Sequence, residues 1–273
     1  MRKTSLLIIL SLVLMPLLNN CKDKKATDQD ENATKVDSTA TEKTALSDEP
    51  PAVNTLSEKE KEEGWILLFD GKTTDGWRGY KKDHFPNGWT IDDQALHCKG
   101  SGRGEAGSKE GGDIIYDKKF DNFTLKLDWK ISEGGNSGIF YLGQEELDYI
   151  WKTAPEMQVL DNEKHPDAKL GKDGNRQAGS LYDLIPAKPQ NAKPAGGWNE
   201  VEITVYKGTV VHKQNGENVV EYHLWTPEWK ELVSGSKFPE LNKDWAEVAS
   251  EGYIGLQDHG DDVWFRNIKL KKL

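Results

Sequence analysis

The residues at positions 123–131, FTLKLDWKI, carry the clearest structural pattern in the chain. Large apolar residues occupy every odd position from Phe123 to Ile131, and polar residues occupy the even positions between them. Successive side chains of a β-strand point to opposite faces, so this alternation predicts a strand with one buried and one solvated face. The stretch therefore indicates a protein built from β-sheets.

Strand patterns surround this stretch on both sides. Residues 65–69, WILLF, form a short apolar run, and residues 200–206 alternate with Val201, Ile203 and Val205 on one side. The pair Asn215-Gly216 separates two more strand patterns and is a strong signal for a two-residue hairpin turn. About a dozen such patterns occur after residue 64 without the spacing of alternating strands and helices. The expected fold is all-β, a jelly-roll sandwich of two antiparallel sheets.

Three other segments give more specific expectations. Residues 180–185 are expected to form a strand. Residues 225–248 carry three tryptophans among charged residues, which is typical of an insertion of loops or short helix. In residues 263–270 the apolar positions change parity, which indicates either a β-bulge near Arg266-Asn267 or a strand whose even positions share one face.

The N-terminal residues differ from the rest of the chain. Arg2 and Lys3 precede an apolar run of about 13 residues, which is shorter than the roughly 20 residues of a transmembrane helix and is typical of a signal peptide. Leu18 stands three places before Cys21, as in the lipobox of bacterial lipoproteins, where the cysteine is lipidated. Ordinary secretion with cleavage nearby is the alternative.

The expected organisation is a lipoprotein signal peptide at 1–20, a disordered tether at 21–56 and a jelly-roll domain at 57–273. The tether assignment follows from a composition of charged residues, threonine and alanine that cannot bury much apolar surface. The expected location is the bacterial cell envelope, periplasmic or cell-surface, with a lipid anchor in the membrane.

Composition limits the kinds of partner. The net charge of -10 disfavours nucleic acid, because an acidic chain repels phosphate backbones. With Cys21 assigned to the lipobox, Cys98 remains alone and is expected to be a packed strand residue. Ten tryptophans against seven phenylalanines favour carbohydrate modestly, since tryptophan stacks on sugar rings as well as filling cores.

Residues 155–162, PEMQVLDN, predict a strand that carries polar groups into this apolar sheet. Glu156 and Gln158 share one parity, opposite to Met157 and Val159, so a pleated strand places them together on one face. A carboxylate beside a carboxamide can hold hydroxyl groups or move a proton. Residues 134–141 and 252–260 repeat the pattern, and we interpret the three segments as lining one concave sugar pocket.

Motifs in order across nearly all of the folded part resemble the 3-keto-disaccharide hydrolase domain family. They are WILLFDGK at 65–72 with Gly76-Trp77, GNSGI at 135–139, EMQVLD at 156–161, GSLY at 179–182, GWNE at 197–200, GLQDHG at 255–260 and FRNI at 265–268. The resemblance implies a concanavalin A-like jelly roll, often exported from bacteria. It also implies activity on glycosides whose glucose ring carries a ketone at C3.

Such a ketone acidifies the proton at C2, so a base can start β-elimination of the aglycone at C1, and water then adds to the enone. The site needs a general base, an acid for the leaving oxygen and donors for the enolate oxygen. The candidate acid–base pair is Glu156 and His259, in either order. The candidate substrate-binding residues are Gln158, Asn136, Tyr182, Gln257, Asp161, Asp258 and Arg266.

Cofactors and two other functions stay open from the sequence. Asp161 and Asp258 have oxygen ligands suited to a divalent cation, although no cofactor is certain. The spacing Glu156-x-Gln158-x-x-Asp161 is similar to the Glu-x-Asp-x-x-Glu signature of retaining glucanases, which need two carboxyl groups about 5–5.5 Å apart. A lectin-like envelope lipoprotein that binds sugar without turnover is the remaining alternative, because fold does not decide function.

Overall fold

The computed structural model describes residues 52–103 and 107–273. The predicted signal peptide, the lipobox with Cys21 and nearly all of the predicted tether lie outside the described residues. No helix in the described part is long and apolar enough to cross a membrane.

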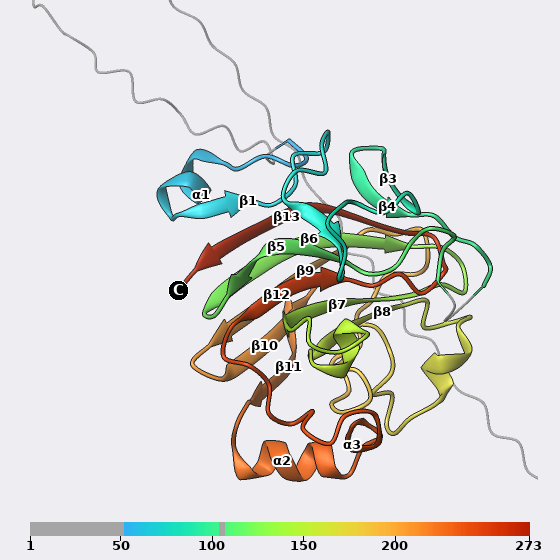
Figure 1. Ribbon diagram of the computed structural model, residues 1–273, viewed down its shortest axis with the longest axis vertical. Coiled ribbons are helices and arrows are strands. Elements are labelled where there is room, and N and C mark those ends of the chain that lie inside the picture. The colour runs from blue at the N-terminus through green and yellow to red at the C-terminus, as the bar shows by residue number, and fades with distance from the viewer. Residues whose placement is uncertain (1–51, 104–106) are drawn as a thin grey trace, which may run out of the picture. The chain divides into compact units, whose positions relative to one another are not determined.

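The described residues form two antiparallel sheets, whose strands are drawn as arrows in Figure 1. The larger sheet has eight strands in the order β11-β10-β9-β6-β13-β4-β3, with β1 paired to β13. Its strands are β1 (Trp65–Leu67), β3 (Trp89–Asp92), β4 (Ala95–Cys98), β6 (Phe123–Ile131), β9 (Asn199–Tyr206), β10 (Thr209–Gln214), β11 (Glu217–His223) and β13 (Val263–Lys272).

The smaller sheet has five strands in the order β2-β5-β12-β7-β8. They are β2 (Trp77–Gly79), β5 (Ile114–Phe120), β7 (Asn136–Gly143), β8 (Glu156–Leu160) and β12 (Gly252–Leu256). The few helices are short: α1 (Glu58–Glu62), η2 (Ile150–Lys152), η3 (Pro166–Lys169), α2 (Pro227–Ser234) and α3 (Phe238–Leu241). The predicted all-β sandwich is confirmed.

The main core is a single hydrophobic cluster to which both sheets contribute. The odd positions of β6 are buried along the whole strand, as its alternation predicts. From the smaller sheet, Met157 and Val159 belong to the same cluster and are fully buried. Burial of apolar area at about 25 cal/mol per Å² makes this cluster the main stabilising contribution. It also fixes which face of β8 turns away from the core.

Backbone details confirm two of the local predictions. Asn215 and Gly216 both have positive φ, 47° and 89°, as a type I′ turn requires, and they join β10 to β11. The register of β13 against β6 shifts between Arg266 and Lys269, where Asn267 has φ 54°. The change of apolar parity in the last strand is therefore a β-bulge.

The structure also shows the conformation of the segments at 180–185 and 225–248. Residues 180–185 are not a strand, which corrects the expectation: Leu181 forms only isolated bridges, to Met157 and Ile185. The chain turns sharply there, since Ile185 N donates back to Leu181 O at 3.0 Å. The insertion at 225–248 contains α2 and α3, the orange helices that lie beyond the end of β11 in Figure 1.

Candidate active site

A cavity of about 420 Å³ lies on the face of the smaller sheet that turns away from the main core. Its volume falls in the range of about 300–1,000 Å³ that is usual for small-ligand sites. Its lining combines carboxyl, amide, imidazole and aromatic groups: Asp113, Asn136, Tyr149, Trp151, Glu156, Gln158, Tyr182, Lys237, Phe238, Leu241, Gln257, Asp258 and His259.

The polar groups come from neighbouring strands of one sheet. Glu156 and Gln158 lie on β8, and Gln158 pairs with Gly138 of β7. Gln257 directly follows β12, and its backbone N donates to Gly138 O at 3.0 Å. Because antiparallel strands run in opposite directions, the end of β12 lies beside the starts of β5 and β7, and β8 is the next strand beyond β7. The three segments that we interpreted as one pocket therefore do meet at one place.

Glu156 is 7% exposed, and its carboxylate forms no hydrogen bond with any residue of the described chain. It lies over Gly138, where an added Cβ would stand 2.6 Å from the carboxyl carbon Cδ. Burial raises the pKa of Glu156 to about 8; the charge of Lys237 lowers it, whereas those of Asp113 and Asp167 raise it. This carboxyl therefore holds its proton at neutral pH.

Asp113, which the sequence analysis did not single out, supplies a second carboxyl to the cavity. Its Oδ1 accepts a hydrogen bond of 3.0 Å from the backbone N of Asp258. Burial raises the pKa of Asp113 to about 7, although the Asp258 amide opposes the shift. Its position directly before the apolar pair Ile114-Ile115 of β5 was the only signal in the sequence. Two carboxyls that change charge near neutral pH thus face one cavity, which is typical of acid–base sites.

Unpaired polar atoms are concentrated here. Five buried side-chain nitrogen or oxygen atoms have no hydrogen-bond partner within the described residues, and three of them belong to Asn136, Gln257 and His259. Native proteins leave few buried polar groups unpaired, so each one calls for an explanation. Amide and imidazole groups that line a cavity and lack protein partners fit a ligand rich in hydroxyl groups.

Asp258 has a structural task at the cavity floor. Its carboxylate accepts hydrogen bonds from the backbone N of Gly112 at 2.6 Å, of Ser108 at 2.9 Å and of Gly260 at 3.0 Å. Burial alone raises its pKa, but these amide hydrogen bonds outweigh burial and the net pKa is lowered. Asp258 is thus an ionised anchor that ties the loop at 107–112 to the segment carrying His259.

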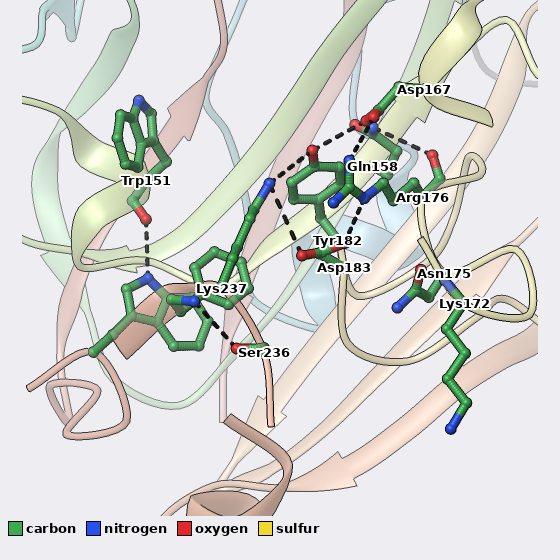
Figure 2. Close-up of polar contacts among 12 residues, drawn as sticks. Trp151, Gln158, Asp167, Lys172, Asn175, Arg176, Tyr182, Asp183, Ser236 and Lys237 are labelled. Carbon is green, nitrogen blue, oxygen red and sulfur yellow. Dashed lines mark hydrogen bonds and ion pairs between the residues drawn. The ribbon is translucent and has the colours of Figure 1, made fainter. Parts of the chain in front are cut away.

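The insertion at 225–248 forms the opposite wall, through Lys237, Phe238 and Leu241. Its aromatic rings hold it in place: Phe238 stacks on Trp245 with centroids 4.0 Å apart. Trp245 Nε1 donates to Trp151 O at 2.9 Å, a bond drawn in Figure 2. Trp151 and the 52% exposed Tyr149 are stacked at 5.2 Å and also line the cavity. The cavity lining therefore combines polar groups with aromatic ones.

Two predicted site residues lie elsewhere, which corrects the prediction. Asp161 does not line the cavity; its carboxylate accepts from the backbone N of Gly134 at 2.7 Å and of Glu163 at 3.1 Å. The carboxyl pair required for a retaining glucanase is thus not formed by Glu156 and Asp161. Arg266 pairs with Asp128 at 3.2 Å and lies 3.9 Å over the ring of Trp198, on the larger sheet.

Tyr182 lines the cavity, but its hydroxyl donates to Asp167 Oδ2 at 3.0 Å and is not free to donate to a substrate. The divalent cation that the sequence left open has no evident site in the described part of the chain, where no group of three or more His, Cys, Asp and Glu side chains could hold a metal. The acidic residues first considered for it, Asp161 and Asp258, both bind backbone amides instead.

A family model and a curated relative both indicate the same protein family. The family model of the 3-keto-alpha-glucoside-1,2-lyase-like domain matches residues 64–271. A 3-keto-disaccharide hydrolase of Bacteroides thetaiotaomicron is 57% identical over 229 residues, covering 77% of this chain and 79% of that protein.

Solved structures agree on the fold. A Parabacteroides distasonis protein, provisionally assigned as a glycosyl hydrolase, has a TM-score of 0.71 at 30% identity and covers 81% of this chain and 100% of its own. A second protein of that organism with the same provisional assignment has a TM-score of 0.58 at 28% identity, covering 77% of this chain and 99% of its own.

Proposed function

The chain belongs to the 3-keto-alpha-glucoside-1,2-lyase-like domain family, and from this premise we propose that it hydrolyses 3-keto-glycosides, 3-keto-disaccharides among them, by elimination followed by hydration. The observation that carries the proposal is the convergence of Glu156, Asp113 and His259 with unpaired amides in one cavity. A site that only bound sugar would need the amides but not carboxyls with raised pKa values.

The proposed reaction needs two proton transfers in each half. A base takes the proton from C2, and the electron pair of that bond forms an enolate on the C3 oxygen. The enolate collapses, a C1–C2 double bond forms, the bond from C1 to the aglycone oxygen breaks, and an acid protonates that oxygen. Water then adds to C1 while a proton returns to C2. The sum is hydrolysis, with no net oxidation or reduction.

We assign the proton transfers by protonation state. Glu156, with its pKa raised by burial to about 8, holds a proton at neutral pH and gives it to the leaving oxygen. His259 takes the proton from C2. In the second half the Glu156 carboxylate accepts a proton from the attacking water, and His259 returns its proton to C2, so both groups recover their starting states. Asn136 and Gln257, whose buried side-chain oxygens have no partner within the described residues, hold the hydroxyl groups of the ring.

The names of the relatives are consistent with this route. The family description refers to a 1,2-lyase, and the relative from Bacteroides thetaiotaomicron is a hydrolase. Elimination across C1 and C2 is a lyase step, and addition of water to its product completes a hydrolysis. The aromatic residues of the cavity lining, Tyr149 and Trp151, suit the flat face of a leaving sugar or ring.

The test is incubation of the purified protein with 3-keto-trehalose, with glucose release as the measurement and unoxidised trehalose as the control. We expect release from the keto sugar alone, and a loss of at least about 100-fold in Glu156→Gln and His259→Asn while both variants still bind the substrate. Saturable binding by the wild-type protein without release would instead support a lectin.

We also propose that the protein is anchored in the bacterial cell envelope through lipidated Cys21, as residues 18–21 suggest. Expression with a labelled fatty acid tests this proposal. Label is expected in the mature wild-type chain and not in Cys21→Ser, and an unlabelled wild-type chain would contradict it.

A further inference from the structure

A connected group of charged and polar residues, whose contacts are drawn in Figure 2, adjoins the cavity. Arg176 is at its centre: its Nη1 donates to Asp167 Oδ1 at 2.8 Å, and its Nε donates to Asp183. Tyr182 donates its hydroxyl proton to Asp167, and Lys237 Nζ donates to the Tyr182 oxygen at 3.0 Å. Of this group, only Tyr182 and Lys237 line the cavity.

The ammonium group of Lys237 has N–H donors that its contacts with the described residues do not use. Both carboxylates of the group already accept hydrogen bonds from Arg176, and Asp183 is 3.9 Å from Lys237 Nζ, an ion-pair distance beyond that of a hydrogen bond. An ammonium has three N–H donors, and the bond to Tyr182 uses one. Lys237 therefore presents a cation with unused donors to the same cavity as Glu156.

The position of this cation is well fixed. Lys237 directly precedes α3, whose first residue, Phe238, stacks on Trp245. The Phe238 backbone N donates to Ser236 Oγ at 3.2 Å. The Lys237 ammonium also lies 4.4 Å from the ring centroid of Tyr182, a cation–π distance. A donor held this firmly needs little reorganisation when charge appears on a ligand.

We propose that Lys237 is a catalytic residue that donates to the carbonyl oxygen at C3 of the substrate and stabilises the enolate formed there. The inference rests on the proposed function, because only an oxidised sugar develops charge at that oxygen. A full positive charge stabilises an oxyanion more than the neutral amides of the cavity can. Tyr182, whose proton is held by Asp167, acts as a positioning residue that accepts from Lys237 and directs it.

If Lys237 stabilises the enolate, its removal should slow the step in which the C2 proton is lost. In Lys237→Met we expect kcat on a 3-keto-glucoside to fall about 100- to 1,000-fold, with KM changed less than about threefold. Exchange of the C2 hydrogen of 3-keto-glucose in D2O, followed by NMR, needs no leaving group and is expected to fall by a similar factor. Tyr182→Phe, which keeps the charge but loses its acceptor, is expected to show an intermediate loss.

The matched control is Lys230→Met, which removes an exposed lysine of the same insertion that forms a surface ion pair with Glu247. It is expected to leave kcat, KM and C2 exchange unchanged. If Lys237→Met does not fold, Lys237→Gln gives the same comparison, since it keeps a donor for Tyr182 without the charge.

The outcomes separate the two proposals. Active wild-type protein with undiminished C2 exchange in Lys237→Met would overturn the role of Lys237 and leave the proposed function standing. A rise in KM alone would also overturn it, because it would show binding without stabilisation of the enolate. A wild-type protein that releases no sugar and exchanges no C2 hydrogen would overturn both.

Discussion

A single carboxyl, Glu156, shows how the site gains reactivity at the expense of stability. The group is almost fully buried and lacks a protein hydrogen bond among the described residues, so burial raises its pKa from 4.5 to about 8. In the unfolded chain the same group ionises near its ordinary pKa. Between these two values the folded state binds a proton that the unfolded state has lost, and the free energy of unfolding therefore falls as the pH rises.

We predict that Glu156→Gln stabilises the protein while it removes activity. The gain is expected to be small at pH 5 and to reach on the order of 2 kcal/mol at pH 8, or several degrees in Tm. Thermal melts of both proteins at the two pH values measure it. Glu217→Gln, at an exposed position of β11, is the control and should change Tm little at either pH. An equal gain in Tm from Glu156→Gln at both pH values would contradict the raised pKa.

Gly138 lies on β7, the strand next to the one that carries Glu156. Because Gly138 has no side chain, the carboxyl of Glu156 has room to lie over it. The φ of Gly138 is not in the left-handed region, and the three atoms closest to an added Cβ all belong to Glu156, so an alanine strains the contact with Glu156.

We therefore predict that Gly138→Ala displaces the carboxyl and lowers kcat at least about 10-fold. Steady-state kinetics measure the effect, and Gly235→Ala is the control, since a Cβ there meets only ordinary contacts of 3.7 Å and longer. Unchanged kinetics in Gly138→Ala would show that activity does not depend on the present position of the Glu156 carboxyl.

At the scale of elements, the site is made by segments that adjoin the strands of the smaller sheet. The loop at 107–112 packs beside the segment after β12 because the Asp258 carboxylate accepts the amides of Ser108 and Gly112. The opposite wall depends on aromatic stacking, in which Trp229 contacts both Tyr222 of β11 and Trp245 of the insertion. The sheet fixes the floor, whereas these contacts fix the walls.

We predict that Asp258→Asn loosens the loop more than the sheets. The neutral amide has only one acceptor oxygen for several donors, so a stability loss of about 2–3 kcal/mol is expected. Hydrogen exchange followed by mass spectrometry should show faster exchange at residues 107–112 and 260, with β6 and β9 unaffected. Faster exchange spread evenly over both sheets would contradict a local anchor.

For the molecule as a whole, the two sheets have different tasks. The smaller sheet carries the polar face of the cavity, and the larger one carries a cation–aromatic group in which Arg266 and Lys130 lie over Trp198. None of these three residues lines the cavity. Function is therefore expected to depend on the smaller sheet, and this group on the larger sheet is expected to contribute to stability alone.

Arg266→Gln tests this division. Loss of the pair with Asp128 and of the contact with Trp198 is expected to lower the free energy of unfolding by about 1–2 kcal/mol. Both kcat and KM should stay within about twofold of wild type. Chemical denaturation and steady-state kinetics measure the two effects. A large loss of kcat in a folded variant would show that Arg266 contributes to the active site after all.

The alternation of residues by itself determined the β-fold and the face on which Glu156 and Gln158 lie, because strand geometry fixes which side chains share a face. The candidate role of Asp161 came instead from its spacing to Glu156, and the structure places Asp161 just beyond the end of β8 and outside the cavity lining. Only the tertiary structure placed Asp113, Trp151 and Lys237 at the cavity. Those residues stand in segments whose positions come from contacts distant in sequence, such as Trp245 with Trp151, and no local pattern of residues records such contacts.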